Sequence, residues 1–314
     1  MIRRQYFFSM KTSQFLQRLK PWMLPIAMAG GIVFHSFMEK VEFVAPYLIF
    51  LMLYITFCKA DFHRLRLTRM SLLLLCVQIP GSLVAYYAFM PLGADVAQGA
   101  FICVFCPTAT AAPVITAMLG GSISALIAYS IVSNISVALL APVIFTFLGN
   151  GAEVNFTDSV LTISAKVIPL ILLPLAAAIV TGRISPRTRR AIAEHQQLSF
   201  YIWALSLFIV VGRAVTFVMA EPVEMAPRMI LIALVAGVMC VAQFYIGRRI
   251  GRACGDKIAG AQGLGQKNTV LAIWMALSYL NPISSVGPAA YIAWQNTINS
   301  LQLYFKSRKE TNRD

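Results

Sequence analysis

Apolar residues in this chain are grouped in long continuous runs, and short connectors, most of them basic, separate the runs. Each run is about 17–25 residues long, the length of an α-helix that crosses the ~30 Å hydrocarbon core of a bilayer. The pattern therefore predicts an all-α membrane protein with ten transmembrane helices and no separate soluble domain. The predicted spans are residues 21–37, 43–60, 70–90, 96–119, 122–149, 159–182, 197–220, 226–246, 255–280 and 283–305.

Two of the predicted spans are interrupted by residues that disfavour a continuous helix. The fourth is interrupted near Pro107 and the ninth near residues 263–266, and a tight turn follows each, at residues 120–121 and 281–282. Because the two units lie five spans apart, they have opposite orientations, so we predict two inverted five-helix repeats. Broken helices at matching places in two repeats indicate the binding site of a transporter.

The charged residues support the membrane assignment and orient the chain. Only 12% of the residues are charged and the net charge is +14. A basic balance can indicate nucleic-acid binding, but here Lys and Arg lie beside the ends of predicted spans, which favours membrane lipid as the partner instead. Among the Lys and Arg residues in the connectors and at the span ends, only Lys40 and Arg228 lie on the side opposite to the others. The positive-inside rule then places both terminal segments, residues 1–20 and 306–314, in the cytoplasm, and we expect a multi-pass protein of a bacterial inner membrane.

Three cations remain inside predicted spans: Lys166, Arg213 and Lys267. Charges inside the bilayer are costly and are functional candidates by default. Lys166 and Arg213 lie about two turns from the outer ends of their spans, so they serve either as snorkelling anchors or as an entrance that attracts anions. Lys267 lies at the interruption of the ninth span, near the middle of the membrane. We expect a functional role for Lys267, and the alternative is that it only braces the fold through exposed carbonyl groups.

Polar residues gather around the two interruptions. We predict substrate contacts at Thr108, Thr110, Asn134, Gln266, Lys267, Asn268, Gln295 and Asn296, and ion coupling at Lys267, Ser133 and Thr269. The alternative for any single member is an ordinary hydrogen bond between helices, worth about 0.6 kcal/mol on average. Their clustering at two matched interruptions favours a binding site.

The acidic residues narrow the class of ligand. By the predicted boundaries, none of the twelve Asp and Glu residues lies deep in a span, so no carboxylate-based ion site is evident. An interior with only cations favours an anionic substrate on electrostatic grounds. The sequence carries no metal-ligand spacing, nucleophile elbow or phosphate loop, so we expect neither an enzyme nor a bound cofactor.

At the interruptions the sequence resembles the bile acid:sodium symporter family. The resemblance lies in Cys106–Pro107 with its following small residues and Thr110, in residues 265–268 (Gly-Gln-Lys-Asn) and in residues 293–296 (Ala-Trp-Gln-Asn). It implies a panel domain of residues 21–60 and 159–220, and a core domain of residues 70–149 and 226–305 in which spans four and nine cross at their unwound centres. Family substrates are organic anions such as bile acids and small carboxylate metabolites, and Asn268, Gln295 and Asn296 would contact them.

The sequence departs from that family at the sodium ligands. A Ser-Asn pair is replaced here by Ala112–Pro113, a Glu by Gly263, and a Gln by Lys267. We therefore expect a carrier of small organic anions that works by alternating access without sodium, with the Lys267 ammonium in place of a bound cation. Such a carrier would be a uniporter, an exchanger or a carrier coupled to protons through Lys267.

Other functions stay open at this point. The main rival is a symporter that keeps sodium coupling through a site rebuilt from Thr108, Thr110, Ser133, Asn134 and backbone carbonyls. A membrane sensor or scaffold that transports nothing is a third candidate and a channel is a fourth, since a fold alone does not determine function. The sequence does not separate a monomer from a homo-oligomer.

Overall fold

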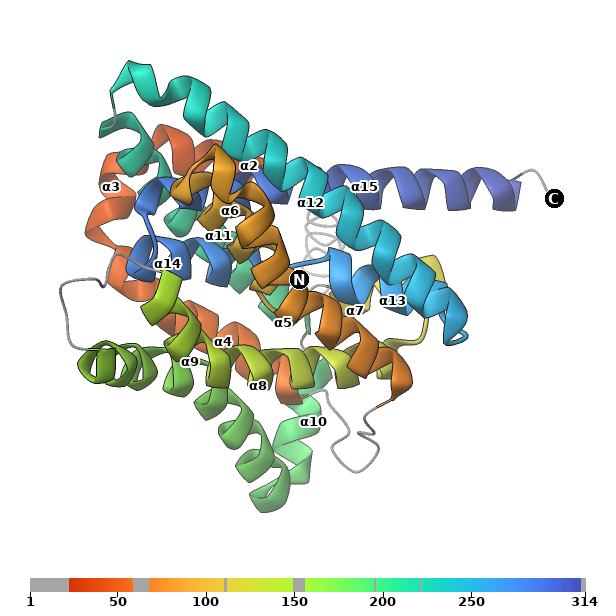
Figure 1. Cartoon of the computed structure of the whole chain (residues 1–314). Helices are drawn as coiled ribbons and strands as arrows, with labels where there is room; N and C mark the ends of the chain where they lie inside the picture. The colour runs from red at the N-terminus through yellow and green to blue at the C-terminus, as the bar shows by residue number, and fades with distance from the viewer. Residues whose placement is uncertain are drawn as a thin grey trace, which may run out of the picture.

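The computed structural model describes residues 23–58, 68–109, 112–148, 156–194, 196–220 and 222–311. These residues form helices joined by short turns (Figure 1), and the only β-type pairing recorded among them is an isolated bridge between Thr108 and Lys267. The all-helical class predicted from the apolar runs is therefore confirmed for this part of the chain. Among the described residues, four helical stretches are long and apolar enough to cross a membrane: Arg69–Leu92, Ile123–Leu148, Ile163–Ile184 and Val223–Ala253.

In the first half of the chain, the first two predicted spans differ from the helices that the structure has. The first predicted span is divided into two helices around Phe34, and a short 3-10 turn precedes the second span. The fourth is divided near Pro107, as predicted. The elements are α2 (Met23–Val33), α3 (His35–Lys40), η2 (Glu42–Val44), α4 (Ala45–Cys58), α5 (Arg69–Phe89), η3 (Met90–Leu92), α6 (Ala94–Phe105), α7 (Ala112–Leu119) and α8 (Ile123–Leu148).

The connector predicted between spans six and seven contains an additional helix. It is α10 (Pro186–Glu194), between α9 (Phe156–Ile184) and α11 (Gln196–Ala220). Its sequence has a proline in the first turn, where the missing amide hydrogen costs nothing, and several basic residues. The Nε of Arg189 donates a 3.0 Å hydrogen bond to the carbonyl oxygen of Cys58, the last residue of α4. This connector is thus a short basic helix fixed to the end of α4.

The second half of the chain extends its helices beyond the predicted spans. It consists of η5 (Val223–Met225), α12 (Ala226–Ala253), α13 (Lys257–Gly265), α14 (Thr269–Tyr279), η6 (Pro282–Ser285) and α15 (Val286–Thr311). α12 continues past residue 246 and α15 past residue 305, and Figure 1 shows the end of α15 projecting from the body. Much of the segment predicted as a tail is therefore helical, because basic residues such as Lys and Arg are good helix formers outside an apolar core.

The helices pack in two groups. In the first, α11 packs against α2, α3 and α4, and α4 packs against α9. In the second, α12 packs against α6, α13 and α15, and α5 packs against α6. α14 and η6 join the groups, because both pack against α11 of the first group and against α6 and α15 of the second. α8 also joins them, because it packs against α9 and against α13.

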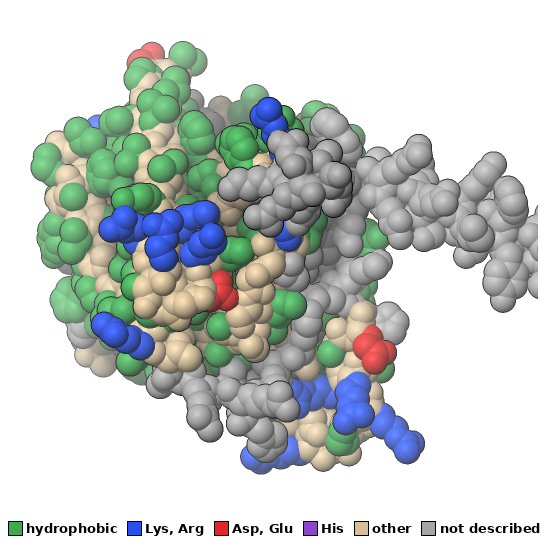
Figure 2. Space-filling model, turned by 90° about the vertical axis from the view of Figure 1, so that its right-hand side faces the viewer, with side chains coloured by type: hydrophobic (Ala, Val, Ile, Leu, Met, Phe, Trp, Pro, Cys, Tyr) green, Lys and Arg blue, Asp and Glu red, His purple; other side chains and the backbone are tan. Residues whose placement is uncertain are grey.

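The surface carries many apolar side chains that a water-soluble protein would bury. Val33, Phe43, Phe147 and Ile184 are each at least 70% exposed. Figure 2 shows apolar side chains over much of the visible face, with Lys and Arg gathered in separate groups among them. Large exposed apolar areas indicate contact with lipid or with another protein.

Candidate functional site

The two interrupted helices end for local reasons. α6 ends at Phe105 because Pro107 lacks an amide hydrogen and forces the preceding Cys106 into an extended conformation, with φ −54° and ψ 142°. α13 ends at Gly265 in a glycine-rich segment. Asn268 then starts α14, where its side-chain oxygen accepts a 3.3 Å hydrogen bond from the amide of Leu271. The first interruption lies at the predicted place, and the second lies slightly beyond residues 263–266.

The two interruptions lie against each other and pair through their backbones. The amide of Ala109 donates to the carbonyl of Gln266 at 2.9 Å, and the amide of Asn268 donates to the carbonyl of Pro107 at 2.8 Å. These two bonds form the antiparallel bridge that joins Thr108 to Lys267. Backbone groups released by each interruption are therefore satisfied by the other, as a nonaqueous environment requires.

Side chains from three different segments cap the end of α6. The carbonyl of Cys103 accepts from Gln243 at 3.1 Å, that of Val104 from Lys267 Nζ at 2.8 Å, and that of Phe105 from Gln78 at 2.8 Å. The last carbonyls of a helix have no partner within the helix and carry its negative dipole end. The ammonium of Lys267 is therefore held at the negative end of α6.

Lys267 is almost completely enclosed. Its side chain is 1% exposed, and the titratable groups that interact with its ammonium are the thiols of Cys103, Cys106 and Cys240. No ion pair recorded among the described residues involves it. In its protonated form, a buried lysine that no carboxylate neutralises is a strong source of positive potential in a medium of low dielectric constant.

Several buried amide and hydroxyl groups at the interruptions lack a protein partner. The amide nitrogen of Gln295 is one, although its oxygen accepts a 3.0 Å hydrogen bond from the backbone of Lys267. The side-chain nitrogen of Asn268, the side-chain oxygen of Gln266 and the hydroxyl of Thr269 are others. Buried polar atoms are almost always hydrogen-bonded, so these atoms mark a place for a ligand, an ion or water.

Ser133 reaches the first interruption only indirectly, and Asn134 bonds within its own helix. The hydroxyl of Ser133 donates to Gln78 Oε1 at 2.7 Å, and the same Gln78 binds the end of α6. Asn134 donates from its amide nitrogen to the carbonyl of Ser130 at 2.7 Å, while its side-chain oxygen has no partner and is buried. Thr108, by contrast, lies directly at the bridge, and its hydroxyl donates to the carbonyl of Gly263 at 2.7 Å.

The remaining predicted site residues lie elsewhere or outside the described residues. Arg213 lies 2.8 Å from a carboxylate oxygen of Glu42, which reduces its capacity to attract other anions. Asn296 is half-buried on α15. Thr110 and the side chain of Lys166 are outside the part of the chain that is described.

Two Gln–Tyr pairs were not predicted from the sequence. The hydroxyl of Tyr129 donates to Gln78 at 2.8 Å, and Gln243 donates to the hydroxyl of Tyr291 at 3.1 Å. Tyr291 in turn donates to the carbonyl of Gly265, the last residue of α13, at 2.8 Å. Each pair thus helps to cap the end of a broken helix. A signal was present, because each Tyr lies four residues before a residue that the sequence did single out, Ser133 or Gln295.

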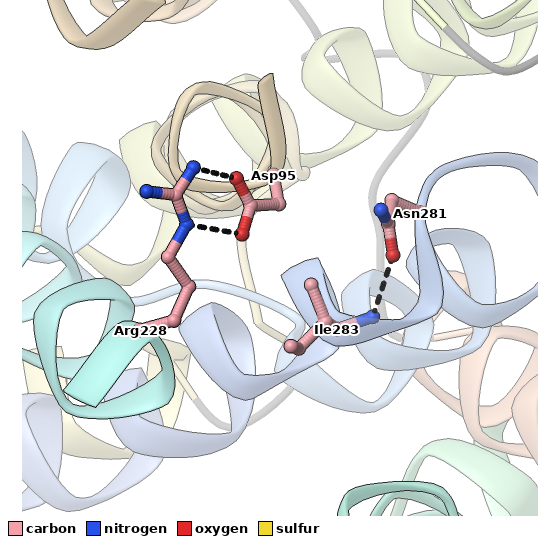
Figure 3. A network of polar contacts seen from close by, with 4 residues as sticks. All are labelled: Asp95, Arg228, Asn281 and Ile283. Carbon is pink, nitrogen blue, oxygen red and sulfur yellow. Dashed lines mark hydrogen bonds and ion pairs between the residues drawn. The ribbon is translucent and has the colours of Figure 1, made fainter. Parts of the chain in front are cut away.

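An ion pair at the other end of α6 was also missed. Arg228 in the first turn of α12 binds both carboxylate oxygens of Asp95 in the first turn of α6, at 2.6 and 2.7 Å (Figure 3). Nearby, Asn281 caps the turn that leads to α15 by accepting from the amide of Ile283. The ion pair thus joins the amino ends of α6 and α12.

The site therefore combines two paired helix interruptions, an enclosed ammonium and several buried amides that have no protein partner. Comparison of the sequence with protein-family models finds no model that matches, and comparison with curated proteins finds no matching relative.

Proposed function

We propose that this protein is a secondary carrier of a small organic anion, which works by alternating access without sodium. The observation that carries the proposal is the enclosed ammonium of Lys267 at the junction of two broken helices. A cation fixed by the protein attracts an anion and takes the place that a bound cation would otherwise have.

The helix ends at the junction favour an anion rather than a cation. The carboxyl ends of α6 and α13 are capped by Lys267, Gln78 and Tyr291, so their negative dipole ends are compensated. Helices α7 and α14 begin just after the interruptions, so their amino ends lie close to the junction. Helix amino ends attract negative charge. The unpartnered amide nitrogens of Asn268 and Gln295 are hydrogen-bond donors that a carboxylate would accept.

The proposed architecture is ten spans in two inverted repeats, with residues 21–60 and 159–220 as the panel and residues 70–149 and 226–305 as the core. The matched Gln–Tyr pairs support the repeat, since each pair joins the corresponding helices of one half. The two packing groups of helices support the division into panel and core. The mostly basic connectors of the sequence support cytoplasmic termini in an inner membrane, and groups of Lys and Arg are visible on the face shown in Figure 2.

Membership of the bile acid:sodium symporter family is part of the proposal, with this chain as a divergent member. Its support is the motif resemblance together with the pairing of the two interruptions at Thr108 and Lys267. The replaced sodium ligands, Ala112–Pro113, Gly263 and Lys267, support the loss of sodium coupling.

A sodium-coupled symporter is the second candidate, and one observation favours it. The side-chain oxygens of Asn134, Gln266 and Thr269 are buried and lack protein partners. Oxygens of this kind are the ligands that hard cations prefer. A retained sodium site would draw its ligands from such oxygens.

Thermal stability separates the two candidates. The purified protein is heated in NaCl and in choline chloride at equal ionic strength, and its apparent melting temperature is compared. A ligand that binds only the folded protein raises stability by mass action. We expect no difference between the salts. A clear stabilisation by Na⁺ would show that sodium coupling is retained.

Flux into proteoliposomes separates a carrier from a channel and from a membrane sensor. Candidate carboxylates are screened with radiolabelled substrate and a counterflow protocol, in which unlabelled substrate inside the vesicles drives uptake of label. A carrier gives saturable counterflow, whereas a channel gives none and a sensor gives no flux. Absence of counterflow for every class of small anion would overturn the proposal.

A further inference from the structure

Polar side chains follow one face of α15 from the helix interruptions toward the end of the helix. They are Gln295, Asn299, Gln302 and Lys306, at intervals of four, three and four residues. This spacing places them on one helix face over about 16 Å, since an α-helix rises 1.5 Å per residue. Gln295 and Asn299 are 0% and 4% exposed, whereas Gln302 is half-buried. The polar face therefore leads from the buried interruptions to the surface.

α13 presents a matching polar face. Gln262 is fully buried, and its amide nitrogen donates to Asn299 Oδ1 at 2.9 Å and to Gln302 Oε1 at 3.3 Å. Gln266, which directly follows the last residue of α13, is 1% exposed. The amide of Gln262 thus joins the two helices. We call the buried and half-buried polar residues around this contact the α13–α15 seam, namely Gln262, Gln266, Gln295, Asn299 and Gln302.

Several buried polar atoms of the seam have no hydrogen-bond partner within it. The side-chain oxygens of Gln262 and Gln266 and the amide nitrogen of Gln295 are buried and have no protein partner. These atoms include acceptors and a donor, which is the combination that water satisfies. Leaving such groups unpaired costs about 1–3 kcal/mol each. A dry seam would be much more costly than an apolar contact between the same helices.

The outer end of the seam is polar as well. The ammonium of Lys306 donates a 2.8 Å hydrogen bond to the carbonyl of Met118, in the last turn of α7. α7 packs against both α13 and α15, and its Thr116 adds another buried hydroxyl that lacks a partner. The seam thus opens beside Gln302 and Lys306, next to the first turns of α13, where the charged residues Asp256 and Lys257 lie.

We infer that the α13–α15 seam is a hydrated path that connects the cytoplasmic surface with the helix interruptions. Water in the seam would form hydrogen bonds with the side-chain amides of Gln262, Gln266 and Gln295. It would thereby reach Gln295, which accepts a hydrogen bond from the backbone amide of Lys267. The path lies within the proposed core domain, so it is separate from the interface between panel and core along which an organic anion would move. It gives water, and protons carried by water, access to the interruptions when no substrate path is open.

Cysteine reactivity tests the seam directly. Asn299→Cys and Gln262→Cys are made separately, and each protein is reconstituted in lipid nanodiscs and treated with 2-aminoethyl methanethiosulfonate. Peptide mass spectrometry measures the rate of modification at the new cysteine, so the native cysteines stay in place. Ile292→Cys on α15 and Leu264→Cys on α13 are the matched controls, because both positions are 0% exposed within apolar clusters.

We expect Asn299→Cys and Gln262→Cys to react about tenfold faster than their controls, because the cysteine thiolate, which forms only in contact with water, attacks the reagent and displaces methanesulfinate. Adding Gln302→Leu to Asn299→Cys should slow the reaction about tenfold by placing an apolar group at the opening. Reaction at both seam positions no faster than at the controls would overturn the inference. Two independent seam positions keep the test decisive if one variant does not fold.

The outcome of the cysteine-labelling experiment does not depend on the proposed transport function. Labelling requires no substrate, so a dry seam would leave the carrier proposal intact. A labelled seam in a protein that shows no counterflow would instead support a hydrated path in a protein with another function.

Discussion

The ammonium of Lys267 donates a 2.8 Å hydrogen bond to the carbonyl oxygen of Val104, across the point where two broken helices meet. Lys267 belongs to the second interruption and Val104 to the last turn of α6, so one side chain joins the two halves of the chain. The contact places a positive charge at the negative end of a helix, which favours it. The same hydrogen bond would also stabilise the fold of a protein that transports nothing. A variant that removes the charge but keeps a hydrogen-bond donor is therefore needed to separate a role in anion binding from a structural role.

Lys267→Gln is the variant that makes this separation. The amide of Gln retains a hydrogen-bond donor but removes the charge, and it introduces a neutral oxygen that can bind a cation. We expect anion counterflow to fall at least about tenfold, since the loss of one charge interaction of about 1.4 kcal/mol has this effect. We also expect NaCl to stabilise the variant relative to choline chloride.

The control for this experiment is Lys257→Gln, which removes an exposed charge from the first turn of α13. It should leave counterflow and the response to sodium unchanged. Normal counterflow in a well-folded Lys267→Gln protein would show that Lys267 only braces the interruptions.

The two capping glutamines give a prediction about stability. Gln78 uses both ends of its amide, donating to Phe105 and accepting from Tyr129 and Ser133. Replacing it with Leu leaves a carbonyl and two hydroxyls without partners, so we expect a loss of about 2–3 kcal/mol. Gln243→Leu should cost less, about 1 kcal/mol, because the oxygen of Gln243 already lacks a partner.

Apparent melting temperatures of the two variants in the same detergent check this ranking. Val84→Ala is the control for a general effect of mutating α5, because Val84 is 68% exposed on that helix. Equal melting temperatures for Gln78→Leu and Val84→Ala would contradict the assigned role of Gln78.

The sequence predicted the features that depend on local chemistry. Pro107 and the glycines at 263 and 265 disfavour helix, so both interruptions were predictable to within a few residues. Ser133 and Gln295 were also recognisable, because a polar residue in an apolar run is conspicuous.

Partners distant in the chain could not be predicted in the same way. Asp95 and Arg228 are 133 residues apart, and nothing local to either residue specifies the other. Gln78 lies in an apolar run, but its role depends on the end of α6, which only the packed structure places beside it. The helix α10 was missed for another reason, since it lacks the long apolar run on which span prediction depends.

The Asp95–Arg228 pair should contribute modestly and should depend on salt. Its geometry is bidentate, but 36% of the Arg228 side chain is exposed, so solvent screens the interaction. We expect a double-mutant cycle of Asp95→Asn and Arg228→Gln to give a coupling free energy of about 1 kcal/mol. The cycle is measured from unfolding in detergent at low salt and in about 1 M NaCl, where the coupling should decrease. A coupling that does not change with salt would indicate a more enclosed pair than this geometry has.

A close contact between glycines of α12 and α13 provides a test of whether the packing of these two helices holds the candidate site in place. A Cβ at Gly260 would meet the carbonyl oxygen of Gly247, and it would lie 2.6 Å from the Cα and 2.8 Å from the nitrogen of Gly251. Because these are backbone atoms, the two helices would have to separate, and overpacking of this kind costs about 1–3 kcal/mol. Gly260→Ala should therefore lower the melting temperature clearly.

Gly81→Ala is the matched comparison, since a Cβ there would lie 3.7 Å from the nearest atom, Val77 Cγ1, an ordinary contact. It should be neutral or slightly stabilising, because Ala has the higher helix propensity. α13 carries one half of the second interruption, so a shift of α13 in Gly260→Ala should also displace Lys267 from Val104 and lower counterflow. Loss of stability with unchanged counterflow would mean that the interruptions hold their own geometry, independently of the helix that leads to them.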